Sequence, residues 1–173
     1  TYTYQKALTT IPLFRFLGNS MIVCAIVITA QIITCSLAAY SFSFFKFKGQ
    51  RILFLAVLAT MMIPADSIII ANYLTISQWK LTDTYLGLVA PYLTSSMVIF
   101  LMRQSFMPIP KGLHEAATLD GCGPFRFWLG IVMPISKPAI ASLGVYVFIQ
   151  VYNQFLWPLL VTNTNEMRTV QVG

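Results

Sequence analysis

The chain has 173 residues, of which 57% are hydrophobic and only 9% are charged, and its formal net charge is +6. A soluble globular domain has about 25% charged residues, so this composition excludes an ordinary soluble fold and indicates a membrane domain. The positive charge requires no nucleic acid, because acidic lipid head groups are sufficient partners for basic residues beside membrane spans. We expect one all-α, polytopic transmembrane domain over residues 1–173.

Four apolar stretches are each long enough to cross a lipid bilayer, which takes about 20 residues of helix. The first runs without a charged residue from Phe16 to Phe45, and only Asp66 interrupts the second. Pro64 lies just before Asp66 and is expected to kink the second span. The predicted spans are residues 18–43, 52–76, 85–106 and 137–162.

Basic residues orient these spans. Residues 44–51 and 103–137 connect the spans on one side and together hold seven lysines and arginines, against four on the other side. The positive-inside rule therefore places both connections in the cytoplasm and both chain ends outside. Because the sequence starts at Thr1 and stops at Gly173 straight after a polar stretch, we expect a piece of a longer protein.

Prolines and a glycine delimit two short helices in the loop 108–134. Pro108 and Pro110 end the third span, because proline cannot continue a helix interior. Residues 111–120 can then form a helix, which Gly121 closes by taking the left-handed conformation. Pro124 is suited to the first turn of a second helix. The pattern predicts a rigid loop, in which the only histidine, His114, faces solvent or a partner.

The spacing in this loop resembles a known motif. Glu115-Ala116-Ala117 is followed after three residues by Gly121, and after nine more by Ile131-Val132-Met133-Pro134. This pattern resembles the cytoplasmic loop of permease subunits in binding-protein-dependent ABC importers. Met133 stands where that pattern usually has leucine, and the swap preserves volume and apolarity.

Three other segments resemble the maltose-type branch of this permease family, which transports sugars and glycerol phosphate. Phe16-Leu17-Gly18-Asn19-Ser20 is similar to the start of a span in that branch, and Phe45-Lys46-Phe47-Lys48-Gly49 is similar to the basic turn that follows it. Tyr152-Asn153-Gln154-Phe155-Leu156-Trp157-Pro158 resembles the Trp-Asn-x-Phe-Leu-Trp-Pro segment of sugar permeases, with Tyr152 in place of tryptophan.

The resemblance implies an assembly in a bacterial or archaeal inner membrane. The implied partners are a second permease subunit, which would form a heterodimer with this one, two ATPase subunits inside and an extracytoplasmic solute-binding protein. The parent protein would carry six spans. This chain has no Walker motif, so we expect no enzymatic activity and no bound cofactor, and ATP would be used by the partner subunits.

The resemblance also implies which residues couple the permease to the ATPase subunits. Alanine side chains are small enough for another protein to approach the helix backbone closely, and Glu115 offers a carboxylate to a basic residue. An ordinary interfacial helix with an exposed glutamate is the alternative. The implied coupling residues are Glu115, Ala116, Ala117, Gly121 and Pro134.

Three polar residues within the predicted spans are candidates for a translocation pathway. At 1.5 Å per residue of helix, Asp66 lies about 22 Å from Arg51, and Asn153 and Gln154 lie about 24–26 Å from Lys137. The three side chains therefore share a similar depth in the bilayer. Polar contacts between helices, with an outer belt of aromatic residues, are the alternative interpretation.

Other classes of function find less support in the sequence. An intramembrane enzyme needs a nucleophile and a base, and no Gly-x-Ser-x-Gly motif occurs, so we expect no catalytic or metal site. An ion channel or proton-coupled carrier would be expected to have several intramembrane carboxylates, and only Asp66 is present. Away from the ends of the spans, no lysine or arginine would neutralise a phosphate, which favours a sugar or oligosaccharide; a glycerol-3-phosphate permease is the alternative.

Overall fold

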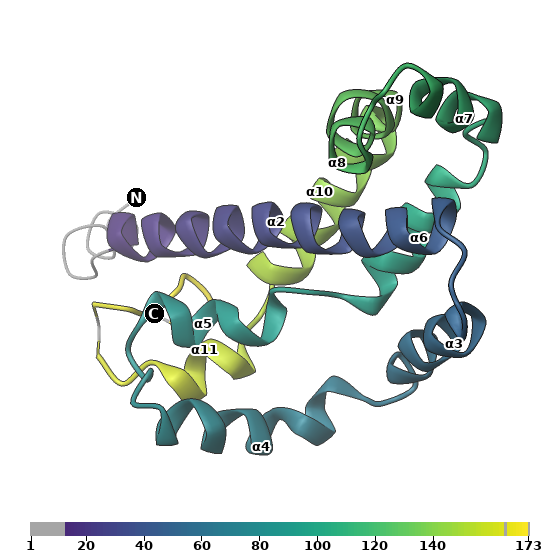
Figure 1. Ribbon diagram of the computed structural model, residues 1–173. Coiled ribbons are helices and arrows are strands. Elements are labelled where there is room, and N and C mark those ends of the chain that lie inside the picture. The colour runs from purple at the N-terminus through teal and green to yellow at the C-terminus, as the bar shows by residue number, and fades with distance from the viewer. Residues whose placement is uncertain (1–12, 165, 173) are drawn as a thin grey trace. The chain divides into compact units, whose positions relative to one another are not determined.

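The computed structural model describes residues 13–164 and 166–172, without the side chains of Ala65 and Asp66. Every regular element among these residues is a helix, which confirms the predicted all-α class (Figure 1). The element η2 is a π-helix. In chain order the elements are α2 (Leu13–Phe44), α3 (Gln50–Thr60), α4 (Ala65–Gln78), α5 (Tyr85–Val89), η1 (Ala90–Tyr92), α6 (Ser96–Phe106), α7 (Lys111–Leu119), α8 (Pro124–Phe127), η2 (Trp128–Val132), α9 (Met133–Ile135), α10 (Lys137–Tyr152) and α11 (Leu156–Val161).

The helices belong to two compact units. The first unit contains the described parts of residues 1–28, 65–93 and 147–173, and the second contains residues 29–64 and 94–146. The long helices α2 and α10 contribute residues to both units. In the first unit α11 packs against α4 and α5 (Figure 1).

A complete break replaces the kink that the sequence predicts at Pro64. Helix α3 ends at Thr60, and the next three backbone N–H groups donate to carbonyls three residues earlier, at 3.0, 3.0 and 3.2 Å. Such bonds tighten the last turn of a helix. Pro64 has no N–H group and disfavours the helical conformation at Ile63, so a new helix starts only at position 65. The second predicted span is therefore two separate helices.

The third and fourth predicted spans are also interrupted. Residues 93–95 separate η1 from α6, which begins where the Ser95 hydroxyl accepts a hydrogen bond from the Val98 N–H group at 3.5 Å. Residues 153–155 separate α10 from α11, and Pro158 lies in the first turn of α11, where a missing N–H group is tolerated. Neither residues 85–106 nor residues 137–162 form one continuous helix.

Among the described residues, α2 alone is long and apolar enough to cross a membrane as a single helix. Two interrupted pairs, Tyr85–Tyr92 with Ser96–Phe106 and Pro124–Ile135 with Lys137–Tyr152, meet the same test only when each pair counts as one segment. The second pair includes residues that the sequence analysis assigns to a loop. The four spans and their boundaries therefore stay predictions.

Trp157 holds the first unit together. Its side chain is buried with Ile76 and Val161, and its indole N–H group donates to the carbonyl oxygens of Gly87 and Leu88, both at 3.2 Å. The Gly87 carbonyl needs this donor, because its helical partner four residues later is a proline, which has no N–H group. The tryptophan thus replaces a backbone hydrogen bond that the sequence cannot make.

Gly87 allows a close approach of two backbone segments, and this contact is testable. A Cβ atom at Gly87 would overlap the carbonyl oxygen of Leu81, whereas nothing lies within 4 Å of a Cβ atom at Gly18 in α2. We expect Gly87→Ala to destabilise the full-length protein by about 1–3 kcal/mol, the usual cost of overpacking. Gly18→Ala is the control and is expected to leave the midpoint of thermal unfolding unchanged or higher. Equal midpoints for the two variants would contradict this packing.

Candidate functional site

Helix α7 ends in the local structure that the sequence predicts. Gly121 has a φ angle of +74°, in the left-handed region. Its N–H group donates to the Thr118 carbonyl at 3.0 Å, and the Cys122 N–H group donates to the Ala117 carbonyl at 2.8 Å. These two bonds form a Schellman motif, in which a left-handed glycine satisfies the last carbonyls of a helix. The predicted conformation of Gly121 is confirmed.

The two alanines of the motif lie on different faces of α7. Glu115 and Ala116 are exposed, whereas Ala117 is buried. Only Ala116 therefore leaves the helix backbone open to a partner, while Ala117 lets α7 pack closely within its own unit. Leu119, one turn after Glu115 on the same face, is 90% exposed. This exposed apolar side chain was not among the residues predicted from the motif.

An aromatic cluster attaches α7 to the end of α2. The His114 ring packs edge-on against Phe127 with 4.8 Å between centroids, and Phe127 contacts Phe44 at 5.5 Å. The Tyr40 hydroxyl donates to the Pro124 carbonyl at 3.2 Å. The His114 ring, which was expected to face solvent or a partner, is half-buried against Phe44, Phe45 and Phe127 within the second unit.

The last predicted coupling residue, Pro134, lies exposed in α9. The π-helix Trp128–Val132 comes directly before α9. A proline clashes with the carbonyl four residues before it, and the wider π-helical turn relieves this clash at Gly130. Pro134 therefore continues the helix that begins at Pro124 instead of ending it, and it lies on a different helix from Glu115.

A cavity of about 460 Å³ in the first unit includes two of the three predicted pathway residues. Asn153 and Gln154 reach it from the break between α10 and α11, and Asn72 reaches it from α4. Asn72 was not among the predicted pathway residues, although it is an uncharged polar residue inside the second apolar stretch. The cavity is lined by Ile68, Ile69, Asn72, Pro91, Tyr92, Asn153, Gln154, Phe155, Leu156 and Trp157.

This cavity has the size and chemistry of a small-molecule site. Such sites have volumes of about 300–1,000 Å³ and combine apolar walls with a few polar groups. Three amide side chains supply both donors and acceptors, and none of the lining residues is charged. Asp66 lies at the start of α4, and its side chain is outside the described part of the structure.

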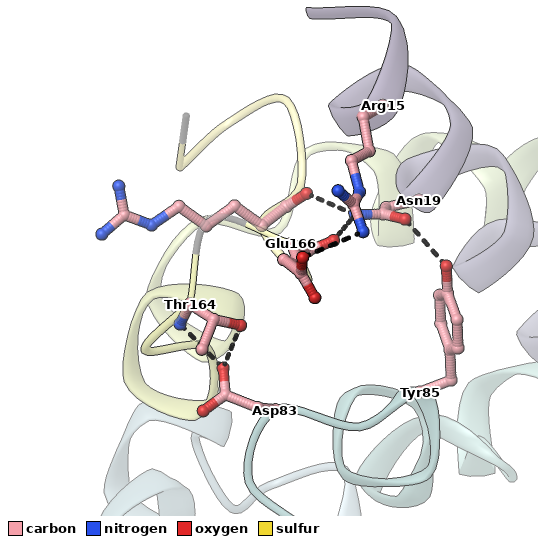
Figure 2. A network of polar contacts seen from close by, with 7 residues as sticks. Arg15, Asn19, Asp83, Tyr85, Thr164 and Glu166 are labelled. Carbon is pink, nitrogen blue, oxygen red and sulfur yellow. Dashed lines mark hydrogen bonds and ion pairs between the residues drawn. The ribbon is translucent and has the colours of Figure 1, made fainter. Parts of the chain in front are cut away.

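Asp83 holds the segment that follows α11, a role that the sequence analysis missed. Its carboxylate accepts a hydrogen bond from the Asn163 N–H group at 2.7 Å. It also accepts hydrogen bonds from the N–H group and the hydroxyl of Thr164, at 2.9 and 3.1 Å (Figure 2). Desolvation raises the pKa of Asp83, but the hydrogen bonds from Thr164 and Asn163 outweigh it and hold the pKa below its usual value. The carboxylate therefore stabilises this segment in its charged form.

The Asn-Ser pair at the start of the first apolar stretch binds the same segment further along. The Asn19 amide donates to the carbonyls of Glu166 and Arg168 at 2.8 and 3.0 Å, and its oxygen accepts from the Tyr85 hydroxyl at 2.7 Å (Figure 2). The Ser20 hydroxyl accepts from the Val170 N–H group at 3.1 Å. These contacts give residues 19 and 20 a structural role.

The helical arrangement defines the class of fold. The structure superposes on the crystal structure of a bacterial ABC transporter involved in the import of the acidic polysaccharide alginate, with a TM-score of 0.88 and 24% identity. The match covers 98% of this chain and 60% of that one. The chain therefore shares the fold of a chain of this ABC transporter.

Residues 31–172 match the family of binding-protein-dependent transport system inner membrane components, and the chain belongs to that family. Its relatives include the sn-glycerol-3-phosphate transport system permease protein UgpE of Brucella abortus (strain 2308), 40% identical over 163 residues. The UgpE protein of Escherichia coli O1:K1 / APEC is 36% identical over 162 residues. Each match covers 94% of this chain and 58% of the relative. The permease family expected from the loop motif is confirmed.

The Asp83 contacts predict a pH-dependent stability for residues 163 and 164. We expect Asp83→Ala to speed hydrogen exchange at the Thr164 amide roughly tenfold at neutral pH, because the hydrogen bonds to the carboxylate are lost. A folded-state pKa below the unfolded value contributes stability at neutral pH, and this contribution disappears as the pH falls through the folded-state pKa.

The matched variant Asp83→Asn separates charge from geometry. It keeps an oxygen that accepts the same hydrogen bonds, so we expect intermediate protection that does not change between neutral and acidic pH, once intrinsic exchange rates are divided out. Identical exchange in the wild type and Asp83→Ala would contradict the assigned contacts.

Proposed function

We propose that this chain is part of the permease subunit of an ATP-driven, binding-protein-dependent importer. The observation that carries this proposal is helix α7, which exposes Glu115, Ala116 and Leu119 on a rigid, glycine-capped helix. Family membership supports the same role, as do relatives that are named as transport system permease proteins. The chain would carry out transport and not chemistry.

In the proposed mechanism, partner subunits hydrolyse ATP and move α7. Glu115 would pair with a basic residue of the ATPase subunit, and Ala116 would let that subunit approach the helix backbone. The aromatic contacts of His114 and Phe127 with Phe44 would transmit the movement to α2, because close-packed rings cannot shift independently. The membrane domain would then alternate its access between the two sides.

The assembly proposed for this chain contains a second permease subunit, two ATPase subunits and an extracytoplasmic solute-binding protein. The basic residues of the loops 44–51 and 103–137 support a cytoplasmic location for both loops. In that orientation the segment held by Asp83 and Asn19 would lie outside, on the side of the binding protein. The lipid bilayer of a bacterial or archaeal inner membrane completes the environment.

The cavity beside Asn153 supports a hydroxylated substrate. Amide side chains hydrogen-bond to hydroxyl groups as donor and acceptor, and the rings of Tyr92 and Phe155 offer apolar surface. A sugar or a short oligosaccharide fits this chemistry. Glycerol 3-phosphate, named in the relatives UgpE, is the second candidate. Its phosphate would need a cation from another subunit, because the cavity lining has none.

The coupling role of α7 is tested by changing its cap. Gly121→Val places a β-branched side chain at a φ angle of +74°, so the end of α7 is expected to unwind and release the ATPase subunits. Gly123→Val is the control, because Gly123 has a φ angle of −66° and nothing lies within 4 Å of its added Cβ atom. We expect co-purification of the ATPase subunits to fall several-fold for Gly121→Val only. If Gly121→Val co-purified with as much ATPase subunit as the wild type, the coupling role of α7 would be contradicted.

The pathway role of the cavity is tested with amide substitutions. Asn153→Ala removes one amide from the lining, and uptake of the transported sugar is expected to fall about tenfold while complex assembly stays intact. Gln150→Ala is the control, since Gln150 is an exposed amide of α10 that does not line the cavity. Equal uptake by both variants at equal expression would leave Asn153 with a structural role only.

A further inference from the structure

The second unit contains a recess with basic walls. A cavity of about 540 Å³ lies between the end of α2, the end of α6 and the start of α7. A neighbouring cavity of about 420 Å³ shares Phe42, Gln50 and Arg103 with it. We call the two together the basic recess. Its charged side chains are Lys46, Arg51, Arg103, Lys111 and Glu115.

Arg103 is held at the junction of the two cavities. Its Nε–H group donates to the Phe42 carbonyl at 3.4 Å, and its guanidinium carbon lies 4.2 Å from the centre of the Phe54 ring. The Gln50 amide donates to the same carbonyl at 2.8 Å. Among the described residues no hydrogen bond or ion pair engages the terminal N–H groups of Arg103. A fixed, planar guanidinium of this kind suits the oxygens of a phosphate group.

The charge of the recess favours an anion. Four basic residues against the single carboxylate of Glu115 give a formal charge of 4 − 1 = +3. The two chain segments that supply most of the lining, 44–51 and 103–111, contain no aspartate or glutamate. The side chains that would neutralise the recess are therefore absent from its own walls, apart from Glu115.

The apolar rim of the recess distinguishes between possible anions. Phe45 and Met107 line the larger cavity and are 37% and 55% exposed. They belong to the ends of the apolar segments that precede the basic residues, so charge and apolar surface adjoin. A lipid with a phosphate head group and acyl chains matches both, whereas free phosphate or an acidic protein segment uses only the charge.

We propose that the basic recess binds the phosphate of an anionic glycerophospholipid. Arg103 supplies the planar contact, Lys46 and Lys111 supply further positive charge, and Phe45 and Met107 lie against the acyl chains. The bound lipid connects α2, α6 and α7, so it ties helix α7 to the membrane. The predicted topology assigns the recess to the cytoplasmic leaflet, where anionic lipids attract basic segments. Lipid binding is measured without transport, so it is separate from the proposed function.

The test uses the full-length permease with its partner subunits in nanodiscs of phosphatidylcholine that contain increasing fractions of phosphatidylglycerol. Phosphatidylglycerol that stays bound is counted by native mass spectrometry. We expect Arg103→Gln to weaken retention about tenfold, as expected for the loss of one charge-assisted hydrogen bond. Lys48→Gln is the matched control, because Lys48 is an exposed basic residue two positions after Lys46 that does not line the recess. Its retention is expected to equal that of the wild type.

Several outcomes would overturn the proposal. Equal losses for Arg103→Gln and Lys48→Gln would indicate general attraction of the basic surface to anionic lipid. Inorganic phosphate that displaces phosphatidylglycerol at millimolar concentration, or that binds equally well in discs of pure phosphatidylcholine, would identify a site for the free ion. Loss of the ATPase subunits from Arg103→Gln with unchanged lipid retention would assign the recess to a protein partner. Arg103→Lys keeps the charge but not the planar fork. We expect it to retain an amount of phosphatidylglycerol between those of the wild type and Arg103→Gln, and this partial retention would show that the variant is folded.

Discussion

Inside a bilayer each backbone N–H and C=O group must find its partner within the protein, because no water is available there. This constraint matters most where a helix is interrupted or ends. At Pro91 the helical donor for the Gly87 carbonyl is missing, and the Trp157 indole takes its place at 3.2 Å. At the end of α2 the Phe42 carbonyl accepts hydrogen bonds from the side chains of Gln50 and Arg103. Side chains from other elements therefore make these interruptions tolerable, and the same contacts build the tertiary structure.

The distance in sequence between a backbone group and its hydrogen-bond partner explains which features the sequence could predict. Gly121 and Cys122 close α7 with bonds to residues three and five positions earlier, so the sequence near the motif was sufficient. The break at 153–155 was not predicted, because Trp157, just beyond it, is fixed by hydrogen bonds to carbonyls about 70 residues away. Lys80, just after α4, takes the left-handed conformation with a φ angle of 55° although it is not a glycine. The end of α4 therefore could not be predicted from a glycine in the sequence.

The candidate sites follow the same division. Asn153 and Gln154 could be selected from the sequence because amides are rare in apolar segments, and the cavity includes both. Asn72 has the same chemistry, but assigning it to the cavity required knowing that α4 faces the break after α10. Asp83 lies in a polar turn like many others, and its importance depends on residues about 80 positions later in the chain. Residue type alone carried no signal of that pairing.

The break at 153–155 shows how one interruption serves both structure and site. Trp157, two residues after the break, uses its indole N–H group to satisfy carbonyls of α5, and its side chain is buried. Asn153 and Gln154 line the cavity, and no hydrogen bond from their side chains to another described residue is present. Because the tryptophan stabilises the interrupted backbone, the two amides do not have to. Their donors and acceptors stay available in the cavity, which is the condition that a site for a hydroxylated ligand must meet.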